Sequence, residues 1–354
     1  MKKLVLVGVV LLASVMVLVG CKMEAGDAKV YTFPAAVKVL TDYESPNNTG
    51  SEWTYVEFGE WPQTIKAASV EVIEDESKKK EMGMFTAYLG SDGNYYVKEK
   101  ENAYGTGDGY QYSDETDAGQ GGKNEQWFKV EPIVWRVLNK DYASTGRALL
   151  LAENILTGGI PYYVHASSRI IGSATVYANN YKYSTIRAWL NGKAESDDTQ
   201  EQNKAYKDKG FLQTAFTPDA QDLIADTIVD NSVASTTDAG QYLDKAINYA
   251  CKNTSDKIFL LSEQEATTEG YDFGVFSASG AGNTRIRVTT DYAKATGAYQ
   301  DGTTGYGGWW WLRSPYYSDG RIARDVDLNG SAHDTKGVIL AEVGVVPALS
   351  ISLQ

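Results

Sequence analysis

Cysteine and histidine are scarce in this sequence, which has 2 Cys and 2 His among its 354 residues. So few cysteines exclude a disulfide framework and the Cys/His clusters that bind structural zinc. His165 and His333 give little support to a nucleophile–histidine arrangement, and no phosphate-binding loop or Gly-x-Ser-x-Gly turn is present. We therefore expect no enzymatic activity, no cofactor and no bound metal.

Basic residues are also in deficit. The chain has 33 Lys and Arg against 46 Asp and Glu, which gives a formal net charge of −13. Proteins that bind nucleic acid need a positively charged footprint for the phosphates. The charge balance therefore excludes nucleic acid as the expected partner, and it favours solubility.

Long apolar runs are missing too, except at the N-terminus. Lys2 and Lys3 precede an apolar run from Leu4 to Gly20, which ends in a small residue just before Cys21. This order is typical of a secretory signal peptide rather than of a membrane helix. Removing residues 1–20 also removes both lysines, so the net charge of the mature chain falls from −13 to −15.

The end of this run, Leu18-Val19-Gly20-Cys21, resembles a bacterial lipobox. The resemblance implies cleavage before Cys21 and acylation of that residue with fatty acids such as palmitate. Several acyl chains on one residue anchor a protein stably in a membrane. We expect a lipoprotein anchored in the bacterial cell envelope, at the outer-membrane surface, although a plain secreted protein with an incidental Cys is the alternative.

What the chain does have is aromatic residues, with 8 Trp, 24 Tyr and 9 Phe. With 43% hydrophobic residues and only Cys251 left unmodified, stability must come from a large core rather than from disulfides. Residues 21–50 contain the stretch SPNNTG and predict a flexible tether, with a short apolar interruption at 37–40. One folded domain is expected over residues 51–354, beginning in the alternating run 53–59.

Within that domain, hydrophobic patterning predicts both strands and helices. A hairpin is expected from 133–138 and 147–151, a buried strand at 257–261, and final strands at 337–340 and 343–353. Helices are expected at 183–191 after Ser184, from Thr217 to Ile228, and from Asp238 to Cys251. Ser262 and Glu265 match a capping box. Polar surface insertions are expected at 90–123 and 192–210.

The most unusual stretch runs from Gly307 to Asp334. It starts with Trp309-Trp310-Trp311-Leu312-Arg313 and turns at Ser314-Pro315. Tyr, Ser, Asp, Arg and Gly then dominate, which is the composition of antibody-like binding surfaces. Flanking strands at 337–340 and 343–353 would hold such a segment at its ends. A core strand followed by an ordinary polar loop fits the composition equally well.

A set of motifs in order resembles a known family. The motifs are EPIVWRVLN, RALLLAENIL, YSTIRAWLN, FLQTAFT, SDKIFLLSEQEA, TTDYAKATG, WWWLRSP and GVVPALSISL. They are similar to the landmarks of DUF6273-type domains, bacterial relatives of the C-type-lectin-like fold. The resemblance implies an α+β fold of the C-type-lectin-like, formylglycine-generating-enzyme type with loop insertions. Together with the lipobox, it extends to the Treponema variable proteins, lipoproteins diversified by a retroelement.

That resemblance implies a hypervariable, surface-displayed segment at 316–335 that binds a protein or glycan ligand. The residues expected to contact this unknown ligand are polar or aromatic: Tyr316, Tyr317, Ser318, Asp319, Arg321, Arg324, Asp325, Asp327, Asn329, His333 and Asp334. The tryptophans before them would be scaffold. Adenine-directed mutagenesis of Asn codons cannot produce Lys, Glu, Gln, Met or Trp, and residues 316–335 contain none of the five.

Departures from the wider family argue against two functions found in it, calcium-dependent sugar binding and formylglycine generation. Related domains commonly carry Arg where this chain has Val346, and Glu131-Pro132 lacks the continuation used by calcium-dependent lectins. The Cys pair of formylglycine-generating enzymes is absent. Two alternatives stay open: an enzyme of the sulfatase-modifying-factor or glycan-hydrolase type, and a structural envelope lipoprotein without a specific ligand.

Overall fold

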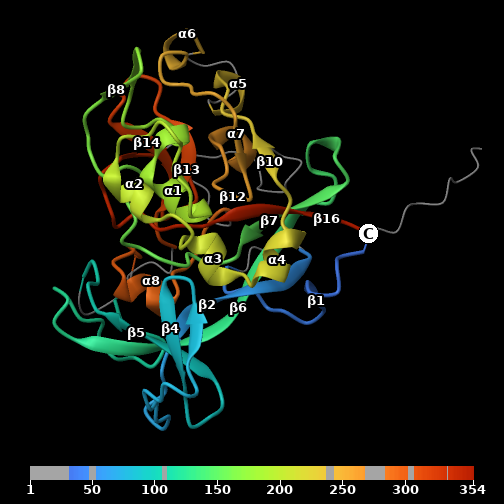
Figure 1. The fold of residues 1–354 in the computed structure, drawn as a ribbon, viewed down its shortest axis with the longest axis vertical. Helices are drawn as coiled ribbons and strands as arrows, with labels where there is room; N and C mark the ends of the chain where they lie inside the picture. Colours follow the sequence, from blue (N-terminus) through green and yellow to red (C-terminus); the bar gives the residue numbers. More distant parts are fainter. Residues whose placement is uncertain are drawn as a thin grey trace, which may run out of the picture. The chain divides into compact units, whose positions relative to one another are not determined.

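Antiparallel strands make up most of the regular structure of the computed structural model, which describes residues 32–47, 53–105, 110–236, 243–267, 284–301, 307–332 and 334–354 (Figure 1). The helices among these residues are few, and none is longer than seven residues. The protein is therefore mixed α/β with mostly antiparallel sheets, and Thr32–Gln354 forms one compact unit. The predicted signal peptide and Cys21 lie outside the described residues.

The main sheet contains nine of the described strands. Its order is β12-β16-β7-β6-β5-β4-β3, while β2 pairs with β6 and β1 pairs with β2. Its strands are β1 (Lys38–Leu40), β2 (Tyr55–Ile65), β3 (Lys80–Met82), β4 (Phe85–Leu89), β5 (Tyr95–Lys100), β6 (Glu125–Asn139), β7 (Arg147–Ala152), β12 (Ile258–Phe259) and β16 (Ala348–Ser352).

Three small antiparallel sheets and several short helices complete the described fold. The sheets pair β8 (Arg169–Ile171) with β9 (Ala174–Val176), β10 (Thr227–Val229) with β11 (Thr254–Asp256), and β13 (Trp310–Pro315) with β14 (Ile322–Val326) and β15 (Asp334–Gly337). The helices are α1 (Thr185–Asn191), α2 (Glu201–Ala205), α3 (Phe211–Ala215), α4 (Pro218–Leu223), α5 (Val233–Thr236), α6 (Leu243–Ala246), α7 (Glu263–Ala266), α8 (Asp291–Ala295) and the 3-10 turns η1 (Tyr142–Ser144) and η2 (Tyr181–Tyr183).

Strands β2 and β6 form the longest pairing in the sheet and bury Trp61 and Trp135. The register shifts where Gly59 adopts a positive φ of 73°. A Cβ at Gly59 would lie 2.5 Å from the ring of Phe216, so glycine is required by both the backbone angle and the packing. Helices α3 and α8 contact β2 (Figure 1).

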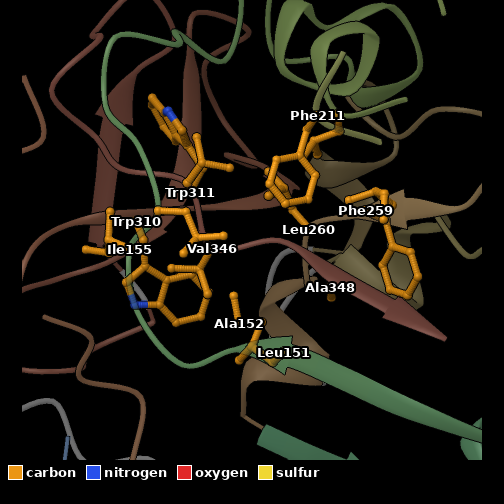
Figure 2. Close-up of a cluster of buried hydrophobic side chains, with 14 of the residues drawn as sticks. Leu151, Ala152, Ile155, Phe211, Phe259, Leu260, Trp310, Trp311, Val346 and Ala348 are labelled. Carbon is orange, nitrogen blue, oxygen red and sulfur yellow. The ribbon is translucent and has the colours of Figure 1, made fainter. Parts of the chain in front are cut away.

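The core joins the main sheet to the strand that carries the tryptophans. Figure 2 shows Trp310 and Trp311 in one cluster with Val346 and with Leu151 and Ala348 of the paired strands β7 and β16. All five side chains are fully buried. Truncating a buried tryptophan costs about 3–5 kcal/mol, so this contact fixes β13 against the main sheet.

Several local predictions are confirmed by the cap geometry. The Ser184 side chain accepts a hydrogen bond from the Arg187 amide at the start of α1. Ser262 and Glu265 form the predicted capping box of α7. Thr217 caps α4, whose first residue is the expected proline. These signals are local in sequence, because a cap bonds an amide two or three residues away.

Other predicted elements need correction. The helix expected to run to Ile228 ends at Leu223, because the next residues pair elsewhere: the Ala225 amide donates to the Ser350 carbonyl at 2.9 Å. The described part of the helix expected over 238–251 is only α6. The insertion expected at 90–123 includes strand β5, and of the strand expected at 337–340 only Gly337 is in a strand, as the last residue of β15.

Part of the predicted tether packs against the domain. Residues 32–47 include strand β1, which pairs with β2, and Val37 is buried in the core. Asn47 is also buried and donates to the Glu153 carbonyl oxygen at 2.7 Å. The apolar interruption at 37–40 is therefore the residue pattern of a short strand that covers the sheet edge.

A fully buried ion pair lies where this N-terminal segment meets the sheet. The guanidinium of Arg136 donates to both carboxylate oxygens of Glu153, at 2.9 and 2.6 Å. Both side chains have no solvent exposure, and Ser45 donates a further hydrogen bond to Glu153. Burial raises the pKa of Glu153, but the charges of Arg287 and Arg136 outweigh burial and hold it below its usual value.

Replacing Glu153 with Gln is expected to lower the free energy of unfolding by about 3–5 kcal/mol at neutral pH, because Arg136 is left buried without a compensating charge. Urea unfolding measures the loss. In the unmodified protein, this contribution is present above about pH 4.3, the usual pKa of Glu, and is lost as the pH falls through the lower folded-state pKa. The variant's stability should therefore depend less on acid pH.

Glu57→Gln is the matched control. Its carboxylate pairs with Lys38 at 2.8 Å, but the two side chains are 26% and 69% exposed. Exposed pairs contribute less than about 1 kcal/mol. Equal losses of stability in the two variants would contradict the special role of the buried pair.

Candidate functional site

The tryptophan run is scaffold, as the sequence predicts. Trp310 and Trp311 are fully buried in β13, and the Trp310 indole donates to the Arg285 carbonyl at 3.1 Å. Trp309 is half-buried: its ring stacks on Tyr299 with centroids 3.8 Å apart, and its indole N–H donates to Asp327. The rings thus anchor the start of the candidate segment and touch its second loop.

Strand β13 is also held by the buried residue that follows the tryptophans. The Arg313 guanidinium donates to the Leu260 carbonyl at 2.7 Å and to the Asp230 carbonyl at 3.0 Å, and it forms an ion pair with Glu265. Burial raises the pKa of Glu265, but Arg313 outweighs burial and lowers it. Ser314 then accepts a hydrogen bond from the Glu263 amide at 2.8 Å.

The segment after Pro315 is two hairpins rather than one long loop. Strand β14 pairs with β13 on one side and with β15 on the other. This arrangement divides the described part of the predicted segment 316–335 into a first loop over 316–321, strand β14, a second loop over 327–332, and the start of β15. Alternating burial along β14 means that only some of its side chains can face a ligand.

The predicted site residues are distributed over these elements. The first loop carries Tyr316, Tyr317, Ser318, Asp319 and Arg321, β14 carries Arg324 and Asp325, and the second loop carries Asp327 and Asn329. His333 lies outside the described residues, and Asp334 lies in β15.

The first loop presents most of its side chains outward. Ser318 and Arg321 are exposed, and the Arg321 guanidinium pairs with Asp319 at 2.7 Å. The hydrogen bond from Arg321 holds the pKa of Asp319 below its usual value. The rings of Tyr316 and Tyr317 lie 4.6 Å apart and are both half-buried. Aromatic, anionic and cationic groups are therefore available side by side.

Tyr316 also contacts strand β14. The guanidinium of Arg324 lies 5.1 Å from the centre of the Tyr316 ring, within the range of a cation–π interaction. A hydrogen bond with Tyr317, then one with Ser318, and the charge of Arg324 lower the pKa of Tyr316. Arg324 itself is 11% exposed and pairs with the buried Glu263 at 3.3 Å. The Arg324 guanidinium therefore lies between the buried carboxylate of Glu263 and the ring of Tyr316 and contacts both.

Asp325 does not belong to the exposed surface that the sequence suggests. It is fully buried, and its carboxylate lies 3.7 Å from the Lys336 ammonium. Strand alternation is the reason, since Asp325 and Ala323 lie on the inward face of β14. The expectation that Asp325 contacts a ligand therefore requires correction.

The polar residues of the second loop build the turn. The Asp327 amide donates to the Ser331 carbonyl, and its carboxylate accepts from the Leu328 amide at 2.6 Å. Asn329 accepts from the Ser331 amide at 3.0 Å. Such side chains commonly stabilise tight turns by bonding nearby amides. Asp327 and Asn329 thus have structural roles besides any contact with a ligand.

One residue that the sequence does not single out holds the first loop in place. Asn179 is fully buried, and its side-chain amide donates to the carbonyl oxygens of Ile322 at 2.8 Å and Asp319 at 3.1 Å. Its backbone amide donates to the Gly320 carbonyl at 2.9 Å. No local motif could reveal this role, because the partners lie about 140 residues further along the chain.

A buried tyrosine connects this anchor with strand β13. The Tyr162 hydroxyl lies 2.8 Å from the Arg313 carbonyl and 3.2 Å from the Asn179 carbonyl. Burial raises the pKa of Tyr162, so the hydroxyl stays protonated and can donate. Both carbonyl partners belong to the backbone.

Within the first loop, Gly320 is fixed by packing. A Cβ at this position would lie 2.5 Å from the ring of Tyr177, whose other neighbour is Tyr249, with ring centroids 4.8 Å apart. Real Cβ atoms do not approach other atoms so closely. The position therefore requires glycine, although it lies in the middle of the predicted variable segment.

Over the described residues, no group of three or more His, Cys, Asp and Glu side chains is placed to hold a metal ion. Within the same residues, no helix is both long and apolar enough to cross a membrane.

These features define a mixed α/β domain whose C-terminal sheet carries two polar hairpins. Residues 145–353 match the family described as domain of unknown function DUF6273, and the protein belongs to that family. The match includes the scaffold residues Tyr162, Asn179 and Arg313 as well as the hairpins. Neither the curated proteins nor the solved structures provide a match to the chain.

Replacing Asn179 with Ala is expected to lower the free energy of unfolding by about 1–3 kcal/mol, because buried carbonyl groups of the first loop lose their donor. Hydrogen exchange of the Tyr316 and Ile322 amides, which bond within the loop, should become faster. Urea unfolding reports the stability of the whole domain, whereas exchange of these two amides reports the opening of the loop.

Asn180→Ala is the neighbouring control: the side-chain oxygens of both residues have no hydrogen-bond partner among the described residues, but only for Asn179 is a side-chain nitrogen shown bonding the first loop. Exchange in the loop should not change in this variant. If both variants accelerate loop exchange equally, Asn179 does not hold the loop.

Proposed function

We propose that this protein is a surface-displayed bacterial lipoprotein, anchored through Cys21, that binds a protein or glycan ligand with the two hairpins of residues 316–335. In this proposal the domain has a C-type-lectin-like fold, and its hairpins are diversified by a retroelement, as in the Treponema variable proteins. The protein acts by binding, without catalysis and without a cofactor or metal.

The observation that carries the proposal is the way in which the first loop is held. The hydrogen bonds described above between Asn179 and the loop all go to backbone carbonyl groups, while the side chains of Tyr317, Ser318 and Arg321 are exposed or partly exposed. A loop held in this way keeps its shape when those side chains are replaced. Rigid scaffolds that present adaptable polar and aromatic groups are suited to recognition.

The chemistry of the loop supports binding of a polar partner. Tyrosines provide large contact areas at low entropic cost, and the Asp319–Arg321 pair offers charges of both signs. Neither sign dominates, so a protein and a glycan fit the loop equally well. The ligand would be whichever partner a particular variant was selected to bind.

Sequencing this gene in sister isolates should show substitutions concentrated at Tyr316, Tyr317, Ser318, Asp319 and Arg321. Gly320, Ala323, Asp325 and Val326 should be spared, because the first lacks space for a side chain and the other three are fully buried. A neighbouring reverse-transcriptase gene with a matching template repeat is expected.

Substitutions distributed evenly over the chain would contradict diversification of this segment. A glycan and protein array then tests binding itself, using several natural variants alongside one in which Tyr316, Tyr317 and Arg321 are all replaced with Ser. Hits that differ among natural variants and disappear in the triple variant support the proposal. An absence of hits for every natural variant would favour a structural lipoprotein.

A further inference from the structure

A cavity of about 500 Å³ lies between the ends of α1, α2 and α3. Its wall includes Lys193, Lys204, Lys207 and Asp208, together with the chain segment 192–196. Cavities of about 300–1,000 Å³ are typical of sites for small molecules. None of the predicted ligand-contacting residues of the hairpins lines it.

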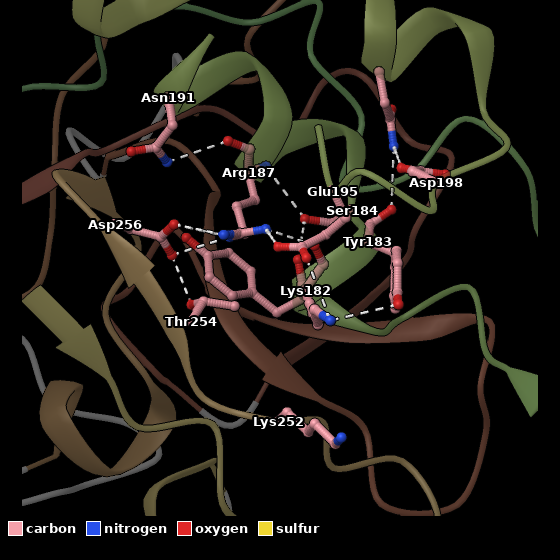
Figure 3. A network of polar contacts seen from close by, with 12 residues as sticks. Lys182, Tyr183, Ser184, Arg187, Asn191, Glu195, Asp198, Lys252, Thr254 and Asp256 are labelled. Carbon is pink, nitrogen blue, oxygen red and sulfur yellow. Dashed lines mark hydrogen bonds and ion pairs between the residues drawn. The ribbon is translucent and has the colours of Figure 1, made fainter. Parts of the chain in front are cut away.

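Positive charge dominates this cavity although the whole chain is acidic. The carboxylate of Glu195 forms ion pairs with Arg187 at 2.7 Å and with Lys182 at 3.3 Å (Figure 3). Within the described residues, the side chains of Lys193 and Lys207 make no ion pair or hydrogen bond, and only their backbone amides donate. Lys204 is likewise paired, with Glu201 outside the wall at 2.9 Å, so the unpaired charges of the wall are those of Lys193 and Lys207 against Asp208.

The wall also offers donors from the backbone. Among the described residues, none accepts a hydrogen bond from the amides of Ala194, Glu195 or Ser196. Exposed lysines and free amides together favour an anionic group. The opposite wall is held in an uncommon conformation, since Asp208 has a φ of 59° and its amide donates to the Gly192 carbonyl at 2.9 Å.

We propose that this cavity binds an acidic saccharide of about disaccharide size, independently of the hairpins. The lysines select the anionic group, and Ser196, Asp208 and the backbone amides bond the hydroxyl groups. No aromatic side chain lines the cavity, so a nucleobase would lack the stacking partner that proteins usually give it. The acidic and hydroxyl groups of a saccharide can instead bond the polar side chains of the wall.

The test uses the full-length chain and a sulfated heparin disaccharide as the probe, with calorimetry at low ionic strength. Lys193→Ala/Lys207→Ala is expected to weaken binding at least roughly tenfold, because charge-assisted hydrogen bonds are lost. Added salt should weaken binding to the unmodified protein. Lys140→Ala/Lys252→Ala removes two exposed lysines outside the cavity and should bind normally.

The proposal would be overturned by no binding of the probe to the unmodified chain, by equal affinity in both double variants, or by equal affinity for inorganic sulfate, which would mean that the saccharide is not recognised. Neutral maltose should bind at least tenfold more weakly than the probe, and equal binding would exclude selection of the anionic group. Because the hairpins are unchanged in every variant, failure here is separate from failure of hairpin recognition.

Discussion

The buried guanidinium of Arg313 fixes the position from which both hairpins extend. It bonds the backbone next to β12, the segment before α5 and the carboxylate of Glu265, so three parts of the chain meet at one side chain. A buried charge is costly unless it is fully compensated, and each partner therefore has to be in place for the others to be stable. Strand β13 is held at its polar end by this network and at its other end by Trp310 and Trp311.

Beyond Arg313, the hydrogen bonds that fix the backbone of the first loop do not depend on which side chains the loop carries. Tyr162 and Asn179 contact carbonyl groups, which every residue type provides, and only Gly320 is constrained by what its side chain would meet. Arg324 marks the limit of this freedom, because its charge is paired with the buried Glu263. The exposed positions can thus change at little cost to the fold, whereas the inward positions cannot.

Local signals in the sequence were sufficient for the caps at Ser184 and Ser262 and for the buried tryptophans, because each depends on residues a few positions apart. The role of Asn179 was not predictable, since its partners are distant in sequence and present only backbone atoms. Strand β14 was missed for a different reason. Its inward face carries Asp325, which is buried although it is charged. The sequence therefore lacks the regular alternation of apolar and polar residues that predicts a strand.

The crowding of Gly320 by Tyr177 has a consequence for the gene. In a locus mutated only at adenines, a codon without adenine is copied unchanged. Glycine, alanine and valine, found at Gly320, Ala323 and Val326, can all be encoded with no adenine, whereas tyrosine and aspartate cannot. If the proposed retroelement diversifies this locus and the template codons of Gly320, Ala323 and Val326 lack adenine, the genetic code protects these three residues without selection. Asp325 is also buried, but every aspartate codon contains adenine, so its retention would depend on selection against misfolded products.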